Sequence, residues 1–323
     1  MSLVQPQSDA TLAIDFAPDA VRVVEMQQHK GVPNIISFAQ QTIDEGPSKD
    51  LPERHLAALN DLLKTQRVRT KRAIAAVPTS MVLTRTVQLD KSKGANSEEQ
   101  ILWALQNCLP FDSRDLVFDF WPVSDPNNGK FGEVMVVATQ ASLVEKYLRG
   151  FEQLGLGCVH LDVAPCAIAT LLQHTSDNAD VPIGTICLTA THGYFAIAER
   201  GRVLFWRPFE LPSAGQGEGA MQTLLDRIGE EVSKCVSHMV GSMHLDNLAE
   251  MALFGQGAGD LLFSEYLKNR FHLPVTSPSP FDALPAEACP ESLRQPADLK
   301  TATYYATALG LALQQSTGGI AHG

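Results

Sequence analysis

Alternating apolar and polar positions at the start of the chain predict three antiparallel strands, then a helix and a fourth strand. The strands are expected at residues 12–14, 20–25, 35–43 and 73–77. Pro52 is suited to the first turn of a helix, and the leucines at 56, 59, 62 and 63 fall on one helical face. Residues 10–80 are therefore predicted to form one α/β unit.

A second unit is predicted over residues 81–162, because the pattern there runs strand, helix, two strands, helix, strand. The first five elements are expected at residues 81–89, 101–109, 116–121, 133–139 and 143–154, and the last strand follows before the unit ends at residue 162. Pro110 ends the first of these helices and Gly155 ends the second. This order of elements is typical of a small α+β sandwich.

The third part of the chain, residues 181–297, repeats the pattern of the first. Strands are expected at residues 182–191, 194–198, 203–209 and 251–254, and helices at 220–243 and 260–270. The stretch from Pro274 to Pro296 is rich in Pro, Ser and Ala and is predicted to be a loop. One last helix is predicted over residues 298–315.

Composition excludes several classes of protein. The 323 residues carry 25 Lys and Arg against 36 Asp and Glu, a formal charge of −11, which disfavours a protein that neutralises nucleic acid. No apolar run approaches the ~18 residues of a membrane span, and the polar start at Met1–Ala10 lacks the apolar centre of a signal peptide. The six cysteines include no Cys-x-x-Cys pair. A cytoplasmic protein with reduced thiols is the expectation.

Two duplicated strand-hairpin units suggest a clamp for phosphate groups, with the candidate chemistry at Asp15 and in the glycine-rich turn Gly255, Gly257 and Gly259. An Asp near such a hairpin coordinates a metal or its waters, and Gly lets backbone N–H groups approach phosphate. Each signal also has a structural explanation, since Asp at a strand end is commonly a turn former and a Gly-rich turn can serve tight packing. No Lys-Ser/Thr pair follows the glycines, so they do not form a Walker loop.

Aromatic residues concentrate in the second unit, at Trp103, Phe111, Phe118, Phe120 and Trp121. Core packing accounts for most of them, and one or two at a rim would suit the anchoring of a partner peptide.

The order of these segments resembles the PilM family of type IV pilus assembly proteins, cytoplasmic members of the actin-like ATPase superfamily. Residues 14–25 resemble the first phosphate hairpin of that family. The segment from Ile101-x-Trp103 to Leu109-Pro110-Phe111 resembles its inserted subdomain, and Leu253–Gly259 resembles its adenosine loop. The resemblance implies a duplicated actin-like α/β fold with an inserted α+β subdomain at 81–162. It also implies that residues 163–180 and 298–315 complete the first unit.

Two departures from the family pattern bear on nucleotide chemistry. The first loop reads Asp15-Phe16-Ala17-Pro18 where the family has Asp-x-Gly, so a Cβ is added and a backbone donor is lost. The matching second loop, Ile186–Gly193, contains no carboxylate. Metal coordination would therefore lose a principal ligand. We expect weak or lost binding of ATP with magnesium, a residual cleft around Asp15, Gly255, Gly257 and Gly259, and no catalytic residue.

Three functions follow from these features. The resemblance implies a scaffold that docks the cytoplasmic tail of a PilN-like inner-membrane protein in a groove between the inserted subdomain and the first unit. Such a scaffold would work with other pilus assembly proteins and reach the membrane only through them, with homo-oligomerisation left open. The alternatives are an active actin-like ATPase that switches or polymerises on ATP with magnesium, and a sugar or acetate kinase of the same fold. The missing second carboxylate disfavours the kinase most.

Overall fold

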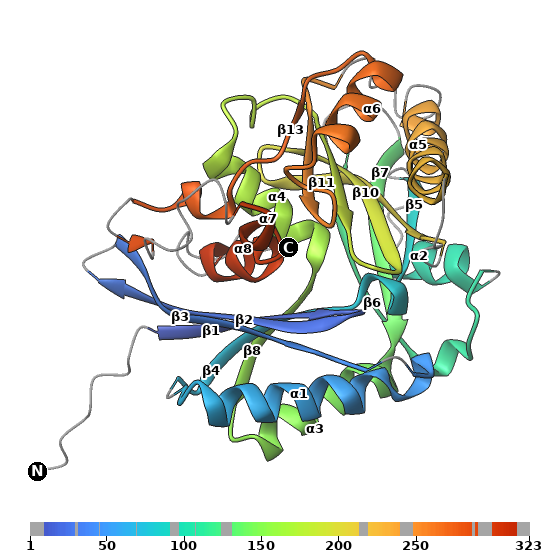
Figure 1. The fold of residues 1–323 in the computed structure, drawn as a ribbon. Coiled ribbons are helices and arrows are strands. Elements are labelled where there is room, and N and C mark those ends of the chain that lie inside the picture. The colour runs from blue at the N-terminus through green and yellow to red at the C-terminus, as the bar shows by residue number, and fades with distance from the viewer. Residues whose placement is uncertain are drawn as a thin grey trace, which may run out of the picture.

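Two five-stranded sheets with the same strand order form the framework of the computed structural model (Figure 1). It describes residues 10–29, 32–44, 46–68, 70–90, 97–106, 108–123, 131–212, 219–239, 248–285, 288–289 and 299–314. The first sheet has the order β3-β2-β1-β4-β8, with β1 antiparallel to β2 and parallel to β4. Its strands are β1 (Ala10–Ala17), β2 (Ala20–His29), β3 (Val32–Thr42), β4 (Arg72–Val77) and β8 (Gly157–Val163).

The second sheet has the order β11-β10-β9-β12-β13. As in the first sheet, two antiparallel pairs are followed by two parallel pairs. Its strands are β9 (Ile183–Leu188), β10 (His192–Glu199), β11 (Arg202–Glu210), β12 (Met251–Gly255) and β13 (Val275–Thr276). The predicted repeat of the first pattern in the third part of the chain is thus present as a repeat of topology. We call the parts built on these two sheets the first and the second half.

Helices separate and cover the two sheets (Figure 1). The helices α1 (Leu51–Thr65) and α3 (Ala141–Gln153) pack together on the outer side of the first sheet. Between the sheets lie α4 (Ala164–Thr175), which contacts β10 and β11, and α8 (Ala306–Gln314), which contacts β1, β2 and β4. The helices α5 (Ala220–His238) and α6 (Leu261–Phe271) pack together on the second half. Residues 240–243 of the predicted helix 220–243 lie outside the described residues.

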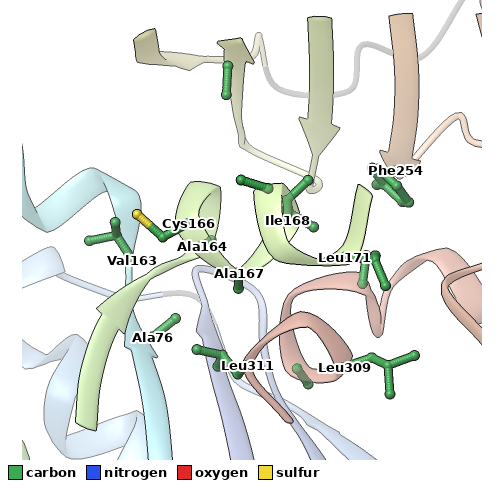
Figure 2. Packing of buried hydrophobic residues seen from close by; sticks show 14 of the residues in the cluster. Ala76, Val163, Ala164, Cys166, Ala167, Ile168, Leu171, Phe254, Leu309 and Leu311 are labelled. Atoms are coloured by element: carbon green, nitrogen blue, oxygen red, sulfur yellow. The ribbon is translucent and has the colours of Figure 1, made fainter. Parts of the chain in front are cut away.

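The helices α4 and α8 touch backbone to backbone in the centre of the molecule. A Cβ added to Gly310 of α8 would lie 2.1 Å from the carbonyl oxygen of Ala167 in α4, so only glycine fits there. Figure 2 shows Ala167 on the side of α4 that faces α8, with Leu309 and Leu311 on α8. The prediction of one continuous helix over 298–315 is wrong, because a turn at Tyr304 and Tyr305 separates α7 (Leu299–Thr303) from α8.

The inserted subdomain is smaller than the predicted 81–162: it is an antiparallel sheet with the order β5-β7-β6 and one helix. The second helix and the last strand of that prediction, α3 and β8, belong to the first half, because β8 pairs with β4 and α3 packs against α1. The elements of the inserted subdomain are β5 (Leu83–Asp90), α2 (Ser97–Gln106), β6 (Leu116–Pro122) and β7 (Phe131–Gln140). A small apolar core that includes Ile101 and Leu105 of α2 holds that helix to the sheet. Trp121 and Met135 belong instead to the main core of the molecule. The sheet of the inserted subdomain is therefore packed against the rest of the protein.

Candidate functional site

The first candidate site is the cleft where the two halves meet, lined by the β1–β2 hairpin, the β9–β10 hairpin, the start of the Gly255 turn and the α7–α8 turn. Its lining residues include Asp15, Arg22, Thr79, Cys187, Thr189, His192, Gly255 and Tyr304. The cavity has a volume of about 60 Å³, which is space for a few water molecules. Sites for small-molecule ligands commonly occupy ~300–1,000 Å³.

Asp15 is buried at the base of this cleft, on β1 and directly opposite Arg22 of β2. Burial raises the pKa of its carboxyl from the ordinary 3.8 to about 7, while the Arg22 guanidinium lowers it and Asp19 raises it. A carboxyl in this environment resists ionisation near neutral pH. It is a poor ligand for a metal ion unless the ion itself replaces the missing solvation.

Arg22 places a cation beside that carboxyl from the chain itself. Its side chain is 5% exposed, lies 3.4 Å from a carboxylate oxygen of Asp19, and stacks with its guanidinium carbon 4.9 Å from the centre of the Tyr304 ring. Positive charge over an aromatic face is attracted by the ring electrons. Arg22 thus ties the first hairpin to the α7–α8 turn.

The turn of the second hairpin, between β9 and β10, is closed by hydrogen bonds between its own residues. The N–H of Thr189 donates to the carbonyl of His192, and the N–H of His192 donates to the Thr189 hydroxyl. Burial raises the pKa of the neighbouring Cys187 thiol to about 12, so it stays protonated. Along β9 and this turn no carboxylate reaches the cleft, as the sequence indicated. Across the described residues, no cluster of three or more His, Cys, Asp or Glu side chains is placed to hold a metal ion.

The glycine-rich turn uses its backbone for internal packing. Gly255, Gly257 and Gly259 all have positive φ, and a Cβ on Gly255 would lie 2.2 Å from the carbonyl oxygen of Leu188. The N–H groups of residues 256, 258 and 260 donate to the carbonyls of Leu188, Gly255 and Gly257, and that of Gly259 donates to the Ser277 hydroxyl. Of the four predicted site residues, Asp15 and Gly255 line the cleft, whereas Gly257 and Gly259 do not.

Together these features do not fit ATP with magnesium. The cavity is small, the single carboxyl among its lining residues is buried with a raised pKa, and the N–H groups of residues 256, 258, 259 and 260 already have acceptors.

The second candidate site is a groove between the inserted subdomain and the first half, with a volume of about 450 Å³. Its apolar lining residues are Pro52, Met81, Val82, Leu83, Pro110, Phe111 and Leu143, and its polar ones are Lys49, Ser80, Gln140, Ser142 and Lys146. Lys146 also lies 3.0 Å from Glu53 across the α1–α3 contact. An apolar floor with a few polar groups at the rim is the composition of a binding groove.

The walls of the groove are fixed by hydrogen bonds. The Thr139 hydroxyl donates to the carbonyl of Met81 at 2.7 Å, which joins β7 to the segment before β5. On the other side, buried His55 of α1 donates from Nε2 to the carbonyl of Ala17 at 2.9 Å and accepts at Nδ1 from the Tyr147 hydroxyl of α3 at 2.8 Å. The two helices that border the groove are therefore locked to each other and to the first hairpin.

The resemblance implied a groove between these two parts of the chain, but it did not indicate which residues form it. They come from α1 and the turn before it, the segment before β5, the segment after α2 and the start of α3. Only Pro110-Phe111 carried a local signal. Likewise, nothing in the sequence pattern marked Arg22 or Tyr304 as neighbours in the cleft.

Comparisons with known proteins identify the family and support the fold described above. The family model described as "Type IV pilus assembly protein PilM" matches residues 13–215. The solved structure of a PilM–PilN type IV pilus biogenesis complex is similar over 96% of this chain and 99% of that chain, with a TM-score of 0.79 and 19% identity. A protein of Bacteroides thetaiotaomicron described as having an actin-like ATPase fold and unknown function is similar over 90% of this chain and 100% of that one, with a TM-score of 0.52 and 11% identity. The fold is that of the actin-like ATPases, as the sequence predicted.

A search of the described helices for a stretch long and apolar enough to cross a membrane finds none.

Proposed function

The chain belongs to the PilM family of type IV pilus assembly proteins, and we propose that within pilus assembly it is a scaffold that holds the cytoplasmic tail of a PilN-like membrane protein. The tail would lie in the groove between the inserted subdomain and the first half. The observation that carries this proposal is the groove itself, whose volume of about 450 Å³ contrasts with about 60 Å³ in the cleft. The solved relative in the PilM–PilN complex supports the choice of partner.

The groove offers two kinds of contact to an extended peptide. Half-buried Phe111, Leu143 and Met81 provide apolar surface for side chains of the peptide. Ser80, Gln140 and Ser142 provide polar groups at the same groove. Attachment through such a tail would bring this protein to the cytoplasmic face of the inner membrane.

A titration of the full chain with the N-terminal peptide of the PilN-like protein from the same source tests the proposal. We expect saturable binding in the micromolar range or tighter, and at least tenfold weaker binding after Phe111→Ala or Leu143→Ala, because each removes apolar contact area. Leu148→Ala is the matched control, since Leu148 is on the same helix as Leu143, is 38% exposed and does not line the groove. Absence of binding at low salt, or equal losses for Leu143→Ala and Leu148→Ala, contradicts the proposal.

For the cleft, the proposal is that nucleotide binding is weak or lost. Support comes from the second hairpin without a carboxylate and from the burial of Asp15, which raises the pKa of its carboxyl to about 7. A ligand at 100 times its Kd stabilises the native state by about 2.7 kcal/mol, so a nucleotide site with micromolar affinity raises the melting temperature clearly at millimolar ligand. We expect no such rise with ATP and magnesium. A rise that disappears in Asp15→Ala would instead favour the active ATPase.

A further inference from the structure

Positive charge is concentrated at one end of the outer helical layer of the first half. Five of the 25 Lys and Arg of the chain fall within residues 64–72, and no Asp or Glu occurs from residue 62 to residue 89, although the formal charge of the chain is −11. A local field of this sign favours contact with an anionic partner. We call the exposed side chains of Lys64, Arg67, Lys71 and Arg72 the basic surface.

The basic surface lies where two parallel helices end (Figure 1). Glu53 of α1 pairs with Lys146 of α3. One turn further along both helices, Leu56 packs against Gly150. The helices therefore run in the same direction, and both end where β4 and β8 begin as parallel neighbours.

The charges of the basic surface are not neutralised within the chain. Across the described residues, Lys64, Arg67 and Lys71 form no ion pair with a carboxylate. The Lys71 ammonium extends over the turn that follows α3, so the surface spans the ends of both helices. Two exposed carboxylates border it, Asp61 on α1 and Glu152 on α3, and the four cations outnumber them.

The groove and the basic surface lie at opposite ends of the same two helices. Pro52 near the start of α1 and Leu143 near the start of α3 line the groove. Lys64 follows Pro52 by 12 residues, which is about 18 Å along a helix. About six residues of an extended chain span that distance. A tail that leaves the groove can therefore reach a membrane that the basic surface touches.

We propose that the basic surface binds the anionic headgroups of a phospholipid membrane and turns the ends of α1 and α3 toward it. Binding to lipid stands apart from the proposed function, whereas the orientation of a protein held by a tail rests on it. Each Lys or Arg near an anionic membrane strengthens binding about fivefold, so four give half-saturation on the order of millimolar lipid. This affinity does not recruit the protein alone. A tail that holds the protein beside the membrane raises the effective lipid concentration, and the contact then persists.

Flotation of the full chain with lipid vesicles, in the absence of any peptide, tests the proposal. One set of vesicles contains equal parts of phosphatidylglycerol and phosphatidylcholine, and the other contains phosphatidylcholine alone. We expect binding at millimolar lipid to the anionic vesicles only, and its loss at high salt. Lys64→Glu with Arg67→Glu should weaken this binding at least tenfold. Lys64→Arg with Arg67→Lys keeps both charges and should bind like the unaltered protein.

The matched control is Arg200→Glu with Lys268→Glu, which changes the net charge by the same amount on the second half. Like Arg67, Arg200 is an exposed residue with positive φ, and Lys268 is exposed on α6. This variant should bind the anionic vesicles within twofold of the unaltered protein.

Three results would overturn the proposal: no preference for anionic vesicles, equal weakening in the two charge-reversed variants, or binding to duplex DNA at least as tight at the same salt. None of them bears on the groove, where Lys64→Glu with Arg67→Glu should bind the tail peptide like the unaltered protein. Failure of the peptide titration, in turn, leaves the binding to vesicles as it is.

Discussion

Replacing Asp15 by Asn should stabilise the protein, and by an amount that depends on pH. The pKa of the carboxyl is 3.8 in an unperturbed chain and about 7 in the folded protein. Below about pH 3.8 it is protonated in both states and contributes nothing. Between pH 3.8 and 7 the unfolded chain ionises while the folded one resists, so the free energy of unfolding falls by about 1.4 kcal/mol per pH unit. Above pH 7 the total cost levels off at about 4 kcal/mol.

Urea unfolding of Asp15→Asn and of the unaltered protein at pH 8 and pH 5 measures this cost. We expect a gain of about 4 kcal/mol at pH 8 and about 1.6 kcal/mol at pH 5, because pH 8 lies above both pKa values whereas pH 5 lies only about 1.2 pH units above the pKa of the unfolded chain. Asp180→Asn is the control, since Asp180 is 93% exposed and its change should stay within about 0.5 kcal/mol at both pH values. A loss of stability in Asp15→Asn at pH 8 would refute the reasoning, since it would mean that the carboxylate is ionised and well paired.

Three further predictions concern the centre of the molecule. Burial lowers the pKa of His55 from 6.5 to about 4, so the stability that the neutral imidazole confers is complete above pH 6.5. On titration to pH 4 the free energy of unfolding should fall by about 3 kcal/mol, which urea unfolding measures. His55→Gln should remove this dependence on pH. Gly310→Ala forces a Cβ into a backbone carbonyl of α4 and should cost about 3 kcal/mol or more in thermal unfolding, whereas Gly157→Ala, whose nearest atom would be 3.7 Å away, should be neutral or slightly stabilising. Arg22→Met removes the cation that lowers the pKa of Asp15, and because the carboxyl can then stay protonated, the part of the loss that comes from Asp15 should be about 1.4 kcal/mol at pH 8 and close to zero at pH 5; equal losses at the two pH values would contradict it.

The duplicated sheets were predictable because their strands carry a local signal, the period-two alternation or an apolar run closed by a tight turn. The helix α4 was not predicted from its pattern, and the reason is physical. It lies between two sheets with residues 164–172 all buried, so it shows no polar face and no period of 3.6. The helix α8 falls within the helix predicted over 298–315, although its residues 306–313 are all buried, and the pattern gave no signal for the break at Tyr304 and Tyr305.

The candidate sites were predictable only in part. Asp15 and Gly255 stand at strand ends where topology alone places them near the cleft. The glycines at 257 and 259 matched a ligand loop by spacing, yet their amides serve the turn itself. Arg22 could not be assigned to the cleft from sequence, because its contact with Tyr304 joins residues 282 positions apart in the chain. The groove is harder still, since its four lining segments become neighbours only after the inserted subdomain has docked.

The energetics of the two sites explain why partner binding falls to the groove. In the cleft, Arg22 is already paired with Asp19, and N–H groups of the glycine turn already donate within the chain, so a ligand that needs these groups must first break Arg22 from Asp19 or open the glycine turn. Breaking a buried ion pair costs several kcal/mol before any contact with a ligand is gained. In the groove, Phe111 and Leu143 present apolar surface that water already covers, and its displacement favours binding from the start. Arg22 and the glycine turn thus serve contacts within the chain, and the open surface for a partner lies one segment away, in the groove that residues 80–83 line.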